Sequence, residues 1–169
     1  MEADKTNQPK TLEERMEAYH QKAAELEKEE DLYSAIKVYE QILHHRPVDM
    51  TALANIGRLY HNVGQLDYAK EALEKVVNSE APDLKPAVLS DVHYHLGLVY
   101  EASGWKEKAL REYEAATVIS HDNENARKKS KEFAHSIAYP KPNDPECYRE
   151  SSESLARLPH RDETLGYLK

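Results

Sequence analysis

The sequence has very little cysteine: Cys147 is the only one among 169 residues. A single cysteine forms neither an internal disulfide nor a cysteine-based zinc site, so neither can hold this fold together. Long apolar runs are also missing, and the first ten residues, MEADKTNQPK, lack the apolar segment of a secretory signal. We therefore expect no membrane insertion, a cytoplasmic location, and a fold stabilised by packing between helices.

Positive charge and apolar residues are scarce as well. The formal net charge is −8, and only 40% of the residues are hydrophobic while 32% are charged. Because binding to a nucleic-acid backbone relies on clustered lysine and arginine, the composition argues against a nucleic-acid partner. The low apolar fraction argues against a thick globular core and favours a thin, extended helical array.

Glycine is sparse too, yet four of the five glycines recur as two matching pairs. The stretches NIGRLYHNVGQLDYAKEAL (55–73) and HLGLVYEASGWKEKALREY (95–113) align at an offset of 40. The aligned positions are Gly57 with Gly97, Tyr60 with Tyr100, Gly64 with Gly104, and Ala69 with Ala109. A weaker copy lies 34 residues before the first stretch, with Ala23 in place of the first glycine and Glu30 in place of the second.

Each glycine of a pair has a separate structural interpretation. Gly57 and Gly97 lack a side chain, so a second helix can approach closely, with Ala69 and Ala109 as the opposing small surface. The tyrosines three residues later are expected to fill the space where the two helices diverge. Gly64 and Gly104 are expected to end the first helix in a left-handed conformation.

This pattern resembles the tetratricopeptide repeat family, whose 34-residue signature has Leu-Gly, Tyr, Ala, an aromatic residue and Pro in order. The chain is similar to a small three-repeat member, with copies at about 16–49, 50–83 and 90–123. The resemblance implies an all-α fold, a right-handed superhelical array of antiparallel helix pairs. Six extra residues in APDLKPAVLSD predict a longer loop and an added first turn near Pro86.

The ends of the array are also predicted. Thr11 followed by Glu14 is typical of a capping box, which places the first helix at Leu12 and leaves 1–11 as a flexible N-terminus. Residues 124–138 are expected to form a capping helix that completes a repeat domain at 12–138. Its two faces are Ala126, Phe133, Ala134 and Ile137 toward the array, and Arg127, Lys128, Lys129 and Lys131 toward solvent.

Residues 139–169 read as an extended, proline-containing C-terminal tail, because Pro140, Pro142 and Pro145 interrupt any helix. The tail carries spaced apolar residues that are too few to build a core. They could anchor the tail on a partner or on the repeats, and an inert tail is equally open. These candidate anchors are Tyr148, Leu155, Leu158, Leu165, Tyr167 and Leu168.

The sequence offers no catalytic constellation. The only cysteine lies in the predicted tail, no serine sits in a nucleophile-elbow pattern, and no phosphate loop is present. His93 and His95 are two residues apart on a helix and point in different directions, so they do not form a metal pair. We predict a non-enzyme with no cofactor and no metal site, and a metal bound by the groove histidines stays as a minor alternative.

The family resemblance implies that a partner peptide or helix binds in a concave groove lined by the first helix of each pair. By position in the repeat, the groove residues are expected to be mixed and polar. They are His20, Gln21 and Ala24, then Asn55, Arg58, His61 and Asn62, then Asp91, Tyr94, His95 and Leu98.

One subgroup of the family clamps the C-terminal carboxylate of heat-shock chaperones with two lysines, two asparagines and an arginine. Carried across by position, those five sites fall on His20, Ala24, Asn55, Asp91 and His95. Only Asn55 matches, and Asp91 would repel a carboxylate, so weak or absent binding to such tails is expected.

The sequence therefore predicts a non-catalytic scaffold or adaptor, a subunit of a multiprotein assembly that binds one or more proteins through its groove, its C-terminal tail or both. The alternative is a chaperone-like carrier or co-chaperone that shields a segment of a client protein. A permanent subunit should stay bound to its partner, whereas a carrier should release its client on assembly.

Overall fold

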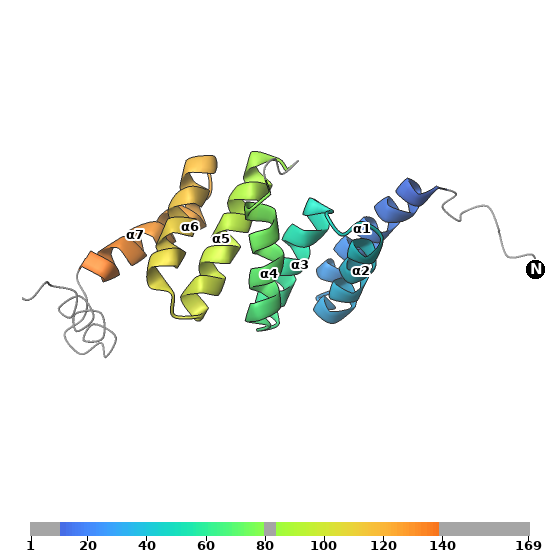
Figure 1. The fold of residues 1–169 in the computed structure, drawn as a ribbon, viewed down its shortest axis with the longest axis horizontal. Helices are drawn as coiled ribbons and strands as arrows, with labels where there is room; N and C mark the ends of the chain where they lie inside the picture. The colour runs from blue at the N-terminus through green and yellow to red at the C-terminus, as the bar shows by residue number, and fades with distance from the viewer. Residues whose placement is uncertain (1–10, 80–83, 139–169) are drawn as a thin grey trace, which may run out of the picture.

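The computed structural model describes residues 11–79 and 84–138. In these ranges seven α-helices follow one another in a single extended row and no strand occurs, which confirms the all-α fold class (Figure 1). The helices are α1 (Leu12–Lys28), α2 (Leu32–His45), α3 (Met50–Asn62), α4 (Leu66–Val77), α5 (Pro86–Ala102), α6 (Lys106–Ile119) and α7 (Glu124–Ala138). None of the helices in these ranges is long and apolar enough to cross a membrane.

The helices pack as successive pairs, α1 with α2, α3 with α4 and α5 with α6, and α7 covers the end of the last pair. Each pair also packs on the next through α2 with α3 and α4 with α5. The first helices α3 and α5 contact each other as well, while the second helices have no comparable contact. The first helices therefore lie on the inside of the curved array. We call the surface formed by α1, α3 and α5 the inner face.

Side-chain caps fix where several helices begin. Thr11 accepts a hydrogen bond from the backbone of Glu14, and the Glu14 side chain accepts one from the backbone of Thr11, which confirms the capping box. Asp31 and Asp49 cap α2 and α3, and each accepts one backbone hydrogen bond, from Ser34 and Ala52. Pro86 occupies the start of α5, which has 17 residues against 13 in α3, so the added first turn is present.

Within the second and third pairs, the two helices meet at a glycine. A Cβ atom at Gly57 would lie 2.6 Å from Cγ of Leu73, and one at Gly97 would lie 2.5 Å from Cε1 of Tyr113. Both distances are far shorter than real contacts, so a Cβ atom at either glycine would force Leu73 or Tyr113 to shift. A large side chain thus forms the nearest part of the opposing surface. The backbone oxygen of Ala69 lies 3.4 Å from the same Cβ position at Gly57, so Ala69 contributes to that surface as expected, and Ala69 and Ala109 are both fully buried.

The turn between the helices of each pair has the same conformation in all three repeats. Gly64 and Gly104 have φ angles of 78° and 81°, as predicted, and Glu30 has a φ of 62°. In every case the residue after this position donates its N–H to a carbonyl five residues earlier, with N–O distances of 2.8 to 2.9 Å. The first repeat therefore makes a glycine-type turn with a glutamate.

Tyr60 and Tyr100 pack within their own pair, as expected, and also join consecutive pairs. Within the pair, Tyr60 contacts Tyr68 of α4 and Tyr100 contacts Trp105 before α6, with ring centroids 5.4 and 5.6 Å apart. The Tyr60 hydroxyl donates to Glu40 of α2 at 2.7 Å, and the Tyr100 hydroxyl donates to Glu74 of α4 at 2.7 Å. Each tyrosine contacts the second helix of the preceding repeat, because α2 packs against α3 and α4 packs against α5.

The helix α7 meets the array through fewer residues than predicted. Ala126 is buried and Phe133 is half-buried against Tyr113, but Ala134 is exposed and Ile137 is 39% exposed. On the side expected to face solvent, Lys129 instead donates to both carboxylate oxygens of Glu101 at 2.9 Å. The contacts of α7 with the array therefore extend from Ala126 to Phe133, and residues 134–137 are exposed.

Two predicted segments lie outside the described residues. They are residues 1–10, most of the N-terminal segment 1–11, and the C-terminal tail 139–169 with Tyr148, Leu155, Leu158, Leu165, Tyr167 and Leu168. The loop residues 80–83 also lie outside. The domain boundaries that depend on these segments stay predictions.

The left-handed turns generate a first testable prediction. Glu30→Gly should stabilise the chain by about 0.5 kcal/mol, because glycine adopts a positive φ freely while a side chain there costs about 1 kcal/mol. Gly104→Ala should destabilise it by about 1 kcal/mol through the backbone alone, since a Cβ there meets nothing within 4 Å. Urea unfolding followed by circular dichroism measures both. Destabilisation by Glu30→Gly would contradict the account.

The glycine contacts inside the helix pairs generate a second testable prediction. Gly97→Ala should cost about 2–3 kcal/mol, more than Gly104→Ala, because its Cβ would overlap the buried ring of Tyr113. The companion change Gly97→Ala with Tyr113→Leu should recover part of the loss in a double-mutant cycle. Additive effects of the two changes would argue against a direct contact.

Candidate functional site

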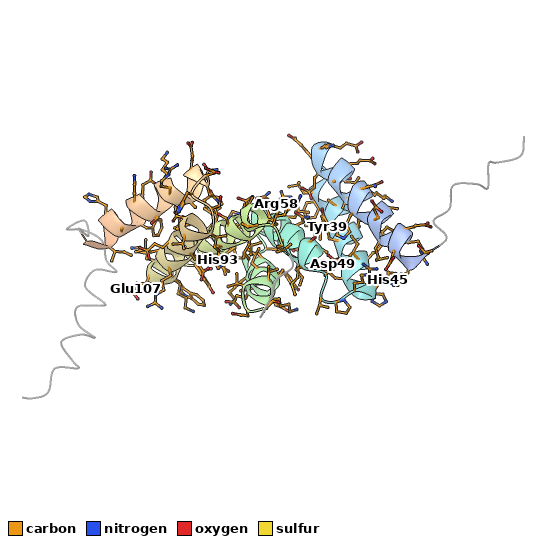
Figure 2. The ribbon with its side chains drawn as sticks, turned by 90° about the horizontal axis from the view of Figure 1, so that it is seen from above. Tyr39, His45, Asp49, Arg58, His93 and Glu107 are labelled. Atoms are coloured by element: carbon orange, nitrogen blue, oxygen red, sulfur yellow. The ribbon has the colours of Figure 1, made fainter. Side chains whose placement is uncertain are left out.

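The inner face is organised around carboxylates in its first and last repeats. In the first, the Tyr39 hydroxyl donates to Glu27 Oε1 at 3.0 Å, and the Arg58 guanidinium donates to the other oxygen of the same carboxylate. Burial and the Glu27 charge raise the pKa of Tyr39 far above its usual value. Figure 2 shows Tyr39, Arg58 and Asp49 at the junction of the first two helix pairs.

The third repeat has the same arrangement. The Tyr113 hydroxyl donates to Glu101 Oε2 at 2.5 Å, and Lys129 of α7 donates to the same carboxylate. Burial and Glu101 raise the pKa of Tyr113. Glu101 lies 74 residues after Glu27, and Tyr113 lies 74 residues after Tyr39, which is the combined offset of the two repeats. A tyrosine, a carboxylate and a cation thus form an internally satisfied cluster in each of these repeats.

The middle repeat lacks this cluster. His61 stands at the position of Glu27 and Glu101, and Leu73 stands at the position of the two tyrosines. On α5, His95 stands at the position that Lys129 holds on α7. The rings of His61 and His95 face each other across α3 and α5, with centroids 6.1 Å apart. Where its neighbours have paired charges, the middle of the inner face has two imidazoles.

These two imidazoles carry unsatisfied atoms. The Nδ1 atoms of His61 and His95 are the only buried side-chain nitrogens or oxygens of the described residues that have no hydrogen-bond partner. Leaving such a group unpaired costs about 1–3 kcal/mol. Native structures hold few such atoms, and a pair of them on facing rings marks a place where the fold itself supplies no partner.

The surroundings keep His95 neutral. Burial first, then the positive charge of Arg58 and the neighbouring His61, lower the pKa of His95 to about 4. Tyr94 packs edge-on against His95 with ring centroids 5.3 Å apart, and it also contacts Tyr113 at 5.9 Å. His61, His95, Tyr94 and Arg58 therefore come together at the centre of the inner face.

The other predicted groove residues are dispersed around this centre. His20 lies 3.3 Å from Asp49 and contacts the edge of Tyr39, so it is held by the first junction. Asn55 and Leu98 are half-buried, while Gln21, Ala24 and Asn62 are exposed. Asp91 accepts a hydrogen bond from Asn123 at 3.2 Å, and burial raises its pKa.

Sequence reasoning missed the residues that pair on this face. Glu27 and Glu101 were not predicted, Lys129 was assigned to solvent, and His93 proves to pair with Glu112 at 2.7 Å. The shared offset of Glu27 with Glu101 and of Tyr39 with Tyr113 could have revealed the clusters. Among the described residues, no group of three or more His, Cys, Asp or Glu side chains could hold a metal ion.

The depressed pKa of His95 predicts how stability changes with pH. The folded state holds His95 neutral down to pH of about 4, whereas the unfolded chain takes up a proton below about 6.5. This group therefore lowers the free energy of unfolding as the pH falls, by about 2 kcal/mol between pH 7 and pH 5. His95→Leu should remove that part of the slope, while His45→Leu at an exposed position should leave it. If the free energy of unfolding changed with pH in the same way for wild type and His95→Leu, the prediction would be contradicted.

Solved structures share this fold at low sequence identity. The first TPR of Spaghetti (RPAP3), bound to the HSP90 peptide SRMEEVD, is 16% identical with a TM-score of 0.63, over 73% of this chain and 93% of that one. The Sgt2 TPR domain from Aspergillus fumigatus is 20% identical with a TM-score of 0.62, over 90% and 89%. The TPR2AB domain of yeast Sti1, in complex with pHSP90, is 19% identical with a TM-score of 0.60, over 84% and 57%.

These similarities confirm the tetratricopeptide fold, and at such identities they show the fold alone. No curated protein matches the chain in sequence. A family model does match: the one described as the TT21 fifth ARM repeats domain aligns with residues 22–131, more than half of the chain. The chain has a tetratricopeptide-type helical repeat fold and belongs to the family of the TT21 fifth ARM repeats domain.

Proposed function

We propose that the protein is a non-catalytic adaptor that binds a peptide or helix of a partner protein on its inner face, as a subunit of a larger assembly. The observation that carries this proposal is the facing pair His61 and His95, whose buried Nδ1 atoms have no partner within the described chain. In the first and third repeats, Glu27 is paired with Arg58 and Glu101 is paired with Lys129. A bound segment could supply what the middle repeat lacks.

The form of the molecule supports this proposal. Helical repeat arrays present an extended curved surface, and an extended peptide or an amphipathic helix fits such a surface better than a compact ligand does.

The direct test uses a matched pair of substitutions. Gln21→Arg places a long charged side chain at an exposed position of α1, at the repeat position of Asn55 and His95, whereas Gln41→Arg makes the same change at an exposed position of α2. Affinity capture from native extract with quantitative mass spectrometry should show at least about a tenfold loss of the main partners for Gln21→Arg only. Equal capture by both variants would exclude the inner face.

A role for the C-terminal tail is proposed separately. Deleting the residues after Tyr139 removes the candidate anchors Tyr148, Leu155, Leu158, Leu165, Tyr167 and Leu168. If the tail takes part, the truncated chain should lose a subset of the captured proteins. Identical partner sets for the full and truncated chains would remove the tail from the proposal.

The co-chaperone alternative is supported by the neighbours, since Spaghetti and Sti1 are described in complexes with HSP90 or its peptide. Those structures do not support the expectation of weak binding to chaperone tails. The residues at the clamp positions still favour it: Ala24 offers no polar group, and Asp91 opposes a carboxylate.

Calorimetric titration with the peptide SRMEEVD separates the two interpretations. From the side chains at these positions, we expect a dissociation constant weaker than about 100 μM, which corresponds to a binding free energy of less than about 5.5 kcal/mol. Micromolar or tighter binding would favour the co-chaperone role. The first TPR of Spaghetti, which binds this peptide, serves as the positive control.

A further inference from the structure

We propose that the facing pair His61 and His95 binds a carboxylate from an acidic side chain within the partner segment, at the centre of the inner face. This inference rests on the proposed function and names the chemistry that the middle repeat recognises. It differs from clamping of a terminal carboxylate, because the lysines and the arginine of that clamp are absent from the corresponding positions.

The first argument is the comparison between the repeats of this chain. Glu27 and Glu101 place a carboxylate at the same point of the first and third repeats, where each accepts hydrogen bonds from a tyrosine and a cation. His61 replaces that carboxylate in the middle repeat. The middle repeat has no carboxylate at this point, and an imidazole, which can donate one hydrogen bond in its neutral form, stands there instead.

The second argument is the state of the two rings. Both Nδ1 atoms are buried without a partner, yet both side chains keep part of their surface exposed. Among the described residues, no side chain forms a hydrogen bond with either Nδ1 atom. A carboxylate has two oxygens, so one such group can accept a hydrogen bond from each imidazole.

The third argument is the sign of the local charge. Arg58 of α3 acts on His95 together with His61, and both disfavour an added positive charge there. Of the acidic groups on the elements packed here, Glu27 is paired with Arg58, Glu101 is paired with Lys129, and Asp91 is bonded to Asn123. A bound carboxylate is therefore favoured over a bound ammonium group.

The proposal implies a proton linkage. A carboxylate beside His95 favours the protonated form of that ring, so binding raises the pKa of His95 from about 4 and takes up a proton. The affinity for an acidic segment should therefore increase as the pH falls from 8 to 6, a range in which an ordinary aspartate or glutamate stays ionised. The linkage separates this site from a permanently charged clamp.

The test uses a positional library of short peptides, acetylated and amidated so that neither end carries a charge. The full chain is compared with the double variant His61→Leu/His95→Leu and with the control variant His45→Leu. His45 is exposed. Figure 2 shows it far from His93, which lies on the same helix as His95. At pH 6.5, wild type and control should enrich glutamate or aspartate over glutamine about tenfold at one position, and the enrichment should fall about threefold or more at pH 8. The double variant should bind peptides without this preference.

Three outcomes would overturn the inference: enrichment of peptides with no acidic preference, a preference for lysine, or an acidic preference that survives in the double variant. A preference seen only in a second library with free C-terminal carboxylates would also overturn it. If wild type enriches no peptide, the proposed function fails as well. A pH titration of the imidazole nuclear magnetic resonance signals in wild type, with the best peptide bound, should show the pKa of His95 raised; an unchanged value would count against the site.

Discussion

In its second and third helix pairs, the structure depends on the contact between a glycine in the first helix and a large side chain in the second. Gly57 meets Leu73 and Gly97 meets Tyr113, at distances that leave no room for a Cβ atom. The close approach buries both of these large side chains completely. With an acidic chain and few apolar residues, this packing takes the place of a thick core. The direction of every later helix follows from how tightly each pair closes.

The same contact positions the inner face. Tyr113 packs on Gly97 with one part of its ring and donates its hydroxyl to Glu101 with the other end. Tyr39 makes the corresponding bond to Glu27, while Leu73 in the middle repeat has no hydroxyl to give. The residue of the second helix that packs against the first helix therefore decides whether a neighbouring carboxylate receives a hydrogen bond. In the middle repeat, the buried Leu73 stands in place of the tyrosine, and the half-buried His61 stands in place of the carboxylate.

Much of the fold could be predicted from the sequence because its signals are local. The recurrence of Gly64 and Gly104 predicts the left-handed turns, and Thr11 with Glu14 predicts the start of α1. The partners of the tyrosines could not be predicted in this way. Tyr60 bonds to Glu40 and Tyr100 to Glu74, and these pairs depend on how one repeat packs on the previous one. The exposure of Ile137 likewise depends on the angle at which α7 meets the array.

For the candidate site, the sequence placed His61, Tyr94 and His95 on first helices through the repeat register alone. It determined the architecture as well, since the spacing of glycine, tyrosine and alanine encodes contacts within a helix pair. Only the tertiary structure decided which of these side chains find partners. Hydrogen bonds and ring contacts across repeats join residues about 30 apart in the chain, such as Glu27 with Arg58 and His61 with His95. Their geometry is set by the packing angle between helix pairs, which no local pattern specifies.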